Sequence, residues 1–344
     1  MSQGVRTLHP GYFALVMATG IVSIAMRNQH ALPLSVTLLW IAMAGYAVLV
    51  ALTVWRLVRF GTDMAADLAD PRRAFGLFTF VAGTNVLGTR LVADARTTAG
   101  LALLAVGLAF WLVLGYVVPW TALLGRVRRP VLQDANGTWF IWVVASQSVA
   151  VLAAALEPTV VTGRRELALL AVLSWSVGAF LYASTAVLVT ARMLLYPFTP
   201  EDLTPPYWVA MGATAITVVA GARIVQMADA PMVAATRGLV AGVSVVFWAF
   251  GTWLIPPLIF AGIWRHVMHR LPLRYEPTLW SIVFPLGMYS AASTYLGNAD
   301  HLPIVRSIGD AESWVALTAW LAVFSAMLRH LGRTQLRTGP DRAG

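Results

Sequence analysis

The sequence predicts an all-α polytopic membrane protein, and composition, residue choice and the length of its apolar runs all indicate this fold class. Of the 344 residues, 59% are hydrophobic and 11% are charged, whereas a soluble domain carries about 25% charged residues. The mean hydropathy of +0.73 argues against a cytosolic enzyme or a disordered chain. The lack of cysteine argues against a disulfide-stabilised secreted scaffold.

Ten apolar stretches are each long enough to cross a membrane, for which a helix needs about 20 residues. Only short polar connections remain between them, so we expect a single transmembrane domain over residues 1–344. The first stretch has no small-residue cleavage site, and we interpret it as a span rather than a removable signal peptide. The predicted spans cover residues 11–26, 34–57, 74–93, 98–124, 137–156, 166–192, 206–228, 238–264, 278–297 and 313–331.

The basic residues predict the orientation of these spans, and all 24 of them are arginines. Sixteen lie in the two termini and in the connections after the even-numbered spans, against seven on the opposite side. Under the positive-inside rule, both termini are expected in the cytoplasm, with the chain in the cytoplasmic membrane. We expect Arg72–Arg73 and the cluster Arg126, Arg128 and Arg129 to bind anionic membrane lipid. Because the arginines follow the membrane boundaries, nucleic acid is not an expected partner.

Uncharged polar residues gather in the odd-numbered spans, whereas the even-numbered spans, except the sixth, are mainly aliphatic and aromatic. Polar side chains in hydrocarbon favour the bundle interior, so we predict five hairpins around a central pore, with odd helices inside and even helices outside. No Asp or Glu lies in the central part of a span, which argues against a carboxylate proton relay. Close helix packing through small residues is the alternative for any single position. The pore-lining candidates are Thr19, Ser23, Thr84, Asn85, Gln147, Thr217, Ser281 and Met288.

Two arginines, Arg90 and Arg223, lie near the ends of odd-numbered spans that are expected to face away from the cytoplasm. A permanently charged guanidinium attracts anions to a low-dielectric opening. Cation pathways are usually lined by Asp and Glu, so the predicted pore favours anions. The alternative for either arginine is that it extends to the membrane surface or pairs with a carboxylate in a loop.

Two motifs resemble a known family. Segment 9–23 (HPGYFALVMATGIVS) is similar to the first-helix signature of the tellurite-resistance/dicarboxylate transporter family, with Ala18 where the family usually has glycine. Segment 280–287 (WSIVFPLG) is similar to its Trp-x-x-x-Phe-Pro pattern in the ninth helix. The family includes fungal malate permeases and sulfite exporters, bacterial tellurite-resistance proteins and plant slow anion channels.

The resemblance implies a homotrimer in which each protomer has its own pore. It also implies that a phenylalanine in the ninth helix blocks the pore at mid-membrane depth, and by motif this residue is Phe284. A bulky ring in a narrow apolar tube excludes a hydrated anion. Pro285 removes a backbone donor beside it, which weakens the helix locally. An ordinary packing role is the alternative for Phe284.

The expected function is therefore an anion channel or carrier for monovalent anions, C4-dicarboxylates such as malate, or oxyanions such as sulfite or tellurite. A dianion would need more positive charge in the pore than the sequence shows, which favours monovalent species or a protonated acid. An intramembrane enzyme and a non-transporting scaffold or sensor are the alternatives. The six histidines lie at or outside span ends, and His266 and His269 have no evident third ligand. We therefore expect neither a metal site nor a cofactor.

Overall fold

The computed structural model describes residues 2–125, 130–228 and 230–337, and within these residues the regular structure is entirely helical. The expected lipid-binding cluster Arg126, Arg128 and Arg129 lies outside the described residues. An apolar chain in hydrocarbon must satisfy its backbone polar groups internally, which favours helices throughout the spans.

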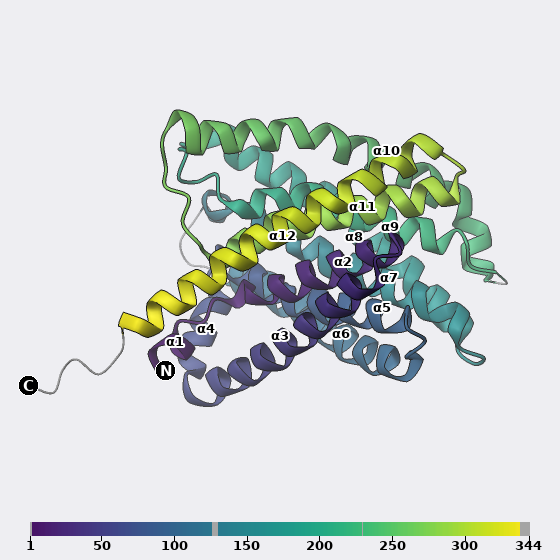
Figure 1. Ribbon diagram of the computed structural model, residues 1–344, viewed down its shortest axis with the longest axis horizontal. Helices are drawn as coiled ribbons and strands as arrows, with labels where there is room; N and C mark the ends of the chain where they lie inside the picture. Colours follow the sequence, from purple (N-terminus) through teal and green to yellow (C-terminus); the bar gives the residue numbers. More distant parts are fainter. Residues whose placement is uncertain (1, 126–129, 229, 338–344) are drawn as a thin grey trace, which may run out of the picture.

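Long helices follow one another along the chain with short connections between them (Figure 1). They are α2 (Ala14–Asn28), α3 (Leu32–Arg59), α5 (Phe78–Val92), α6 (Thr97–Val118), α7 (Phe140–Leu156), α8 (Arg164–Leu195), α9 (Val209–Ile224), α10 (Pro231–Ile263), α11 (Trp280–Ala299) and α12 (Pro303–Arg337). Two shorter helices, α1 (Ser2–Arg6) ahead of α2 and α4 (Gly61–Ala69) directly after α3, both contact α3. The π-helical segments Pro119–Leu124 and Trp264–Met268 extend α6 and α10.

Within the described part of the chain, nine helical segments are long and apolar enough to cross a membrane. Helix α11 is not among them, although it has 20 residues. Its serines, tyrosines and glycines lower its hydropathy, and sixteen of its twenty residues are buried. Polar and small residues of this kind are tolerated where a helix is surrounded by protein.

Five of the long helices form a closed inner ring. In this ring α2 contacts α5, α5 contacts α7, α7 contacts α9, α9 contacts α11, and α11 contacts α2. Each inner helix also packs against the helix that follows it, namely α3, α6, α8, α10 and α12. The most apolar windows of α2, α5, α7 and α9 are 83% to 94% buried, against 17% to 39% for the five outer helices.

Every inner helix begins with a short 3-10 turn, a repeat that links the five hairpins. The turns are Pro10–Phe13, Ala74–Leu77, Gly137–Trp139, Pro205–Trp208 and Pro277–Leu279. In each case the last turn residue or the first helical residue is aromatic. With the turn included, the inner segments of α2, α5, α7 and α9 reach 19 to 23 residues, close to the length that a membrane requires.

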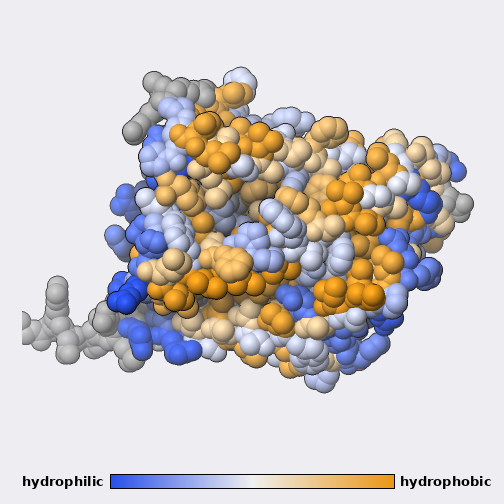
Figure 2. Space-filling view, turned by 90° about the horizontal axis from the view of Figure 1, so that it is seen from above, coloured by the Kyte–Doolittle hydropathy of each residue, from blue (hydrophilic) through white to orange (hydrophobic). Residues whose placement is uncertain are grey.

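The surface has the distribution expected of a membrane protein. Figure 2 shows a broad hydrophobic region in the middle of the molecule and hydrophilic residues toward both of its ends. Outer-helix side chains such as Trp40, Phe180 and Trp253 are among the exposed large hydrophobic residues. The outer helices α10 and α12 begin several residues before the predicted spans, at Pro231 and Pro303, because proline is well placed in the first turn of a helix.

Candidate functional site

A narrow cavity lies inside the ring of α2, α5, α7, α9 and α11, and all five helices contribute to its wall. Its volume is about 20 Å³, counted as room for the centres of water molecules, and one water needs roughly 10–15 Å³ on this scale. The wall is mainly aliphatic, so a hydrated ion would have to lose water to enter. The lining residues are Ile21, Ile24, Val86, Thr89, Ser148, Val151, Ile216, Val219, Arg223, Met288, Ala291 and Tyr295.

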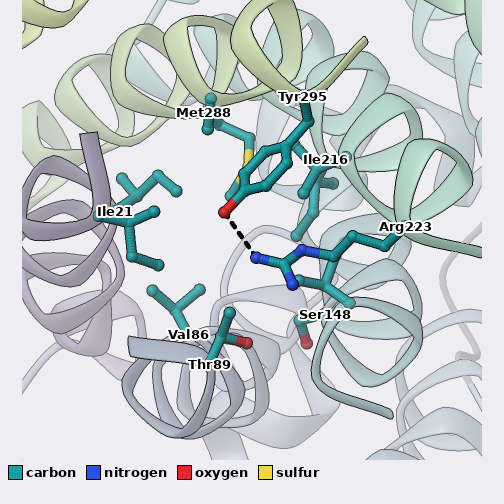
Figure 3. A pocket seen from close by; sticks show the side chains of 12 residues that line it. Ile21, Val86, Thr89, Ser148, Ile216, Arg223, Met288 and Tyr295 are labelled. Atoms are coloured by element: carbon teal, nitrogen blue, oxygen red, sulfur yellow. Dashed lines mark hydrogen bonds between the residues drawn. The ribbon is translucent and has the colours of Figure 1, made fainter. Parts of the chain in front are cut away.

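Arg223, near the end of α9, brings a permanent positive charge to this cavity. Figure 3 shows its guanidinium extending across the cavity toward Tyr295 of α11. Nη2 donates a hydrogen bond of 2.6 Å to the Tyr295 hydroxyl, and the guanidinium carbon lies 4.5 Å from the centre of the Tyr295 ring. The buried Nε has no hydrogen-bond partner within the described residues, so the guanidinium keeps donor capacity for a ligand.

Phe284 lies on the same face of α11 as the lining residues Met288, Ala291 and Tyr295. Residues four, seven and eleven positions apart on a helix fall within about 40° of one another. Phe284 is 1% exposed and precedes Met288 by one turn, which places it next to the cavity on the side of the N-terminal ends of the inner helices.

The neighbours of Phe284 explain this orientation. Pro285 packs against α9, where a Cβ added to Gly212 would lie 2.9 Å from its Cγ. Gly287 packs against α2, where its own added Cβ would lie 2.9 Å from Cγ2 of Ile21. The stripe of α11 between these two contacts therefore faces the centre of the ring.

Several predicted pore-lining hydroxyls are instead bonded to neighbouring helices. The indole nitrogen of Trp320 in α12 donates to Thr19 at 2.9 Å. Thr84 donates to the carbonyl of Phe80, and its hydroxyl also lies 3.0 Å from that of Tyr46 in α3. These side chains join an inner helix to an outer helix. At these positions the hydroxyls therefore serve helix packing, which is the alternative to lining a pore.

Two predicted amide residues also bridge helices. Asn85 donates to the Ser148 hydroxyl at 2.9 Å, and an added Cβ at Gly107 of α6 would overlap its Oδ1. Gln147 donates to the carbonyl of Trp175 in α8 at 3.1 Å. Both side chains are fully buried. Their amide nitrogens are bonded to neighbouring helices, whereas Asn85 Oδ1 and Gln147 Oε1 have no hydrogen-bond partner among the described residues.

The remaining pore-lining candidates differ in position. Thr217 donates back to the carbonyl of Ala213 in its own helix, and Ser281 is buried near the start of α11. Met288 lines the cavity. Among the described residues, Met288 is thus the pore-lining candidate that reaches this cavity. Tyr295, which is not among the candidates predicted from the sequence, lies opposite Arg223.

Arg90 has a different environment from Arg223. It is fully buried and pairs with Asp94 at 2.7 Å. Its guanidinium also donates to the hydroxyls of Ser23 in α2 and Ser35 in α3. Arg90 therefore joins three helices. Its pairing with Asp94 matches the alternative that the arginine pairs with a carboxylate in a loop.

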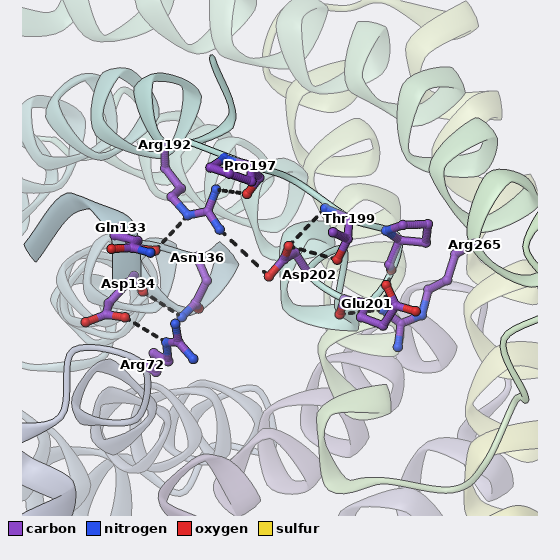
Figure 4. A network of polar contacts seen from close by, with 11 residues as sticks. Arg72, Gln133, Asp134, Asn136, Arg192, Pro197, Thr199, Glu201, Asp202 and Arg265 are labelled. Atoms are coloured by element: carbon purple, nitrogen blue, oxygen red, sulfur yellow. Dashed lines mark hydrogen bonds and ion pairs between the residues drawn. The ribbon is translucent and has the colours of Figure 1, made fainter. Parts of the chain in front are cut away.

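A polar hollow occurs at the other end of the ring, where the inner helices begin (Figure 4). Its volume on the same scale is about 310 Å³. Arg192 donates to the carbonyls of Gln133 and Pro197, and Arg72 pairs with Asp134 at 2.8 Å. The charged groups here hold the connections together. Four carboxylates and two arginines line the hollow within the described residues, so it carries no excess of positive charge.

His9 lies at the edge of this hollow, ahead of the first inner helix. Its Nδ1 accepts a hydrogen bond of 3.0 Å from the backbone nitrogen of Gly11. Burial, followed by the positive charge of Arg73, lowers the pKa of His9 to about 4, with Asp67 acting in the opposite sense. His9 is therefore neutral at physiological pH and caps the turn that begins α2.

A polytopic membrane protein with an arginine-bearing cavity inside a helix ring belongs to the class of small-solute channels and transporters. The family described as voltage-dependent anion channel matches residues 7–328. The chain belongs to this family. This match confirms the family resemblance that the motifs in the first and ninth spans indicated. Membership indicates anion transport rather than the intramembrane enzyme considered above.

Three relatives illustrate the range of similarity. An uncharacterized membrane protein of Mycobacterium tuberculosis is 68% identical over 160 residues, which cover 46% of this chain and 81% of the relative. An uncharacterized transporter of Methanocaldococcus jannaschii is 23% identical, covering 93% of this chain and 94% of the relative. A sulfite efflux pump of Arthroderma benhamiae is 20% identical, covering 93% of this chain and 90% of the relative.

Proposed function

We propose that the protein conducts small anions across the cytoplasmic membrane through the centre of its inner ring, with Phe284 as a gate in each protomer. The observation that carries this proposal is the position of Phe284 on the α11 stripe that also lines the Arg223 cavity. One end of the path is the hollow at the N-terminal ends of the inner helices, and the gate separates it from the cavity.

Charge and size favour monovalent anions as the substrates. The cavity has one guanidinium, and no Asp or Glu lines it within the described residues. A dianion such as malate would bring a second negative charge into an apolar space of about 20 Å³, where an uncompensated charge is costly. The similarity to sulfite efflux pumps supports a singly charged oxyanion such as bisulfite as a second substrate to test.

The proposed topology has ten spans and both termini in the cytoplasm. Two facts support it: α11 completes the inner ring, and Figure 1 shows the N terminus near the end of the molecule toward which α12 leads. An even number of spans returns a chain to its starting side. The homotrimer implied by the resemblance is part of the same proposal, and chemical cross-linking of the protein in membranes would test it.

The gate is tested by measuring chloride and nitrate flux in liposomes for the parent and Phe284→Ala. Removal of the ring is expected to raise flux about tenfold, as lowering a barrier by about 1.4 kcal/mol would do. Phe75→Ala is the matched control, because Phe75 is equally buried but packs against Trp139 near the start of α7. Equal flux in the parent and Phe284→Ala would refute the gate, and no anion flux in any variant would refute the proposed function.

A further inference from the structure

Tyr295 separates two hollows. It lines the central cavity, and it also lines a hollow at the C-terminal ends of α2 and α11. This outer hollow has a volume of about 410 Å³ on the same scale, far larger than the 20 Å³ of the cavity. Among the residues described for both walls, Tyr295 is the shared one. Its ring therefore lies where a solute would pass from one space to the other.

Two interactions with Arg223 hold Tyr295 in this position. The hydroxyl accepts the 2.6 Å hydrogen bond from Nη2, and the ring faces the guanidinium at 4.5 Å (Figure 3). Both are attractive, since a charged donor strengthens the hydrogen bond and the ring face is electron-rich. Within the described residues no carboxylate pairs with Arg223, so a neutral phenol is its principal partner.

A small anion would compete directly with the phenol for the guanidinium. An anion offers a full negative charge where Tyr295 offers only a neutral oxygen, and Arg223 Nε is a further donor without a partner among the described residues. Thr89 and Ser148 line the same cavity, but their hydroxyls donate to backbone carbonyls of their own helices, so Arg223 is the donor that an anion would meet. Once its hydrogen bond to Nη2 is replaced, Tyr295 is free to rotate toward the outer hollow.

We propose that Tyr295 is a second gate, in series with Phe284, and that an anion opens it by taking its place on Arg223. This inference rests on the proposed anion path. The two aromatic residues are eleven positions apart on α11, about 16 Å along the axis, and the cavity lies between them. The compartment holds one small anion at a time, and the gate selects against solutes that cannot replace a phenol on a guanidinium.

Flux measurements test the series arrangement. With Phe284 limiting, Tyr295→Ala alone is expected to change chloride flux by less than about twofold. In the Phe284→Ala background, Tyr295→Ala is expected to raise flux about tenfold further, the factor represented by one charge-assisted hydrogen bond. Tyr289→Ala is the matched control, because Tyr289 is on the same helix but its hydroxyl meets Thr252 of α10. No effect of Tyr295→Ala in either background would overturn the second gate.

Thiol accessibility tests the gate independently of flux. The chain has no cysteine, so Ala291→Cys would place a single thiol in the cavity wall. In intact cells, the impermeant anion 2-sulfonatoethyl methanethiosulfonate is expected to modify it about tenfold faster when Tyr295→Ala is added. Asn298→Cys, in the outer hollow, is the control and should react equally with or without Tyr295→Ala.

The two experiments separate the two proposals. Equal modification rates at Ala291→Cys with and without Tyr295 would overturn the gate even if anion flux is measured. Faster modification together with no flux in any variant would refute the proposed transport function while supporting Tyr295 as the barrier to the cavity.

Discussion

At the scale of single residues, arginines with similar sequence contexts have different roles because their partners differ. Arg90 and Arg223 are each near the C-terminal end of an inner helix. Asp94, one turn after Arg90, pairs with it and is shared with Arg27. Arg223 meets a tyrosine and a cavity. Only a pairing partner distinguishes them, and the partner of Arg223 is 72 residues away in the sequence.

His9 provides a prediction at this scale. Since its pKa is lowered to about 4 in the folded protein, the unfolded chain, with an ordinary pKa near 6.5, binds more protons between these pH values. Stability therefore falls as pH decreases through this window. From pH 7 to pH 5 we expect a loss of about 2 kcal/mol from this group.

Thermal unfolding in detergent at pH 7 and pH 5 would measure this loss. His9→Asn is the control, because asparagine can accept the same capping hydrogen bond without titrating. The parent should lose more stability on acidification than His9→Asn. An identical pH dependence of the two proteins would contradict the role assigned to the histidine.

At the scale of elements, the 3-10 turns at the starts of the inner helices determine how closely the hairpins meet. A Cβ added to Gly137, in the turn before α7, would lie 2.3 Å from the backbone carbon of Pro206 in the turn before α9. No side chain fits at that distance without moving the backbone. Sequence reasoning located the spans but not these turns, because their contacts join segments that are far apart in the chain.

Gly137→Ala is therefore expected to destabilise the protein by about 2–4 kcal/mol through overpacking. Gly115→Ala, in the outer helix α6, is the control, because an added Cβ there meets nothing within 4 Å. Chemical or thermal unfolding of both purified variants would measure the difference. Equal stability of the two variants would mean that the turns can separate without cost.

At the scale of the whole molecule, the ring of inner helices and the coat of outer helices explain the hydropathy pattern. Outer helices are mostly apolar because their exposed faces meet lipid, and Figure 2 shows the resulting hydrophobic region. Inner helices can be more polar because protein surrounds them. Helix α11 illustrates this: it is not among the nine segments of the described chain that are apolar enough to be counted as spans, and sixteen of its residues are buried.

The proposed topology gives the prediction at this scale. Epitope tags at the N and C termini should both be protected from protease in intact cells and cleaved in inverted vesicles. A tag inserted at Val161, which is 96% exposed between α7 and α8, should show the opposite pattern. Opposite protection of the two terminal tags would indicate an odd number of spans, in which case α11 would not cross the membrane.

The sequence by itself determined the helical class, the family and most of the segments apolar enough to cross a membrane, because hydrophobic run length and local motifs are properties of contiguous residues. It also predicted Met288 and Arg223, which line the cavity. The tertiary structure decided which polar groups face the centre. Thr19, Thr84 and Gln147 bond to outer helices, while the cavity wall is mostly aliphatic. Most buried polar groups find a hydrogen-bond partner, and whether that partner is a helix or a solute depends on residues distant in the chain.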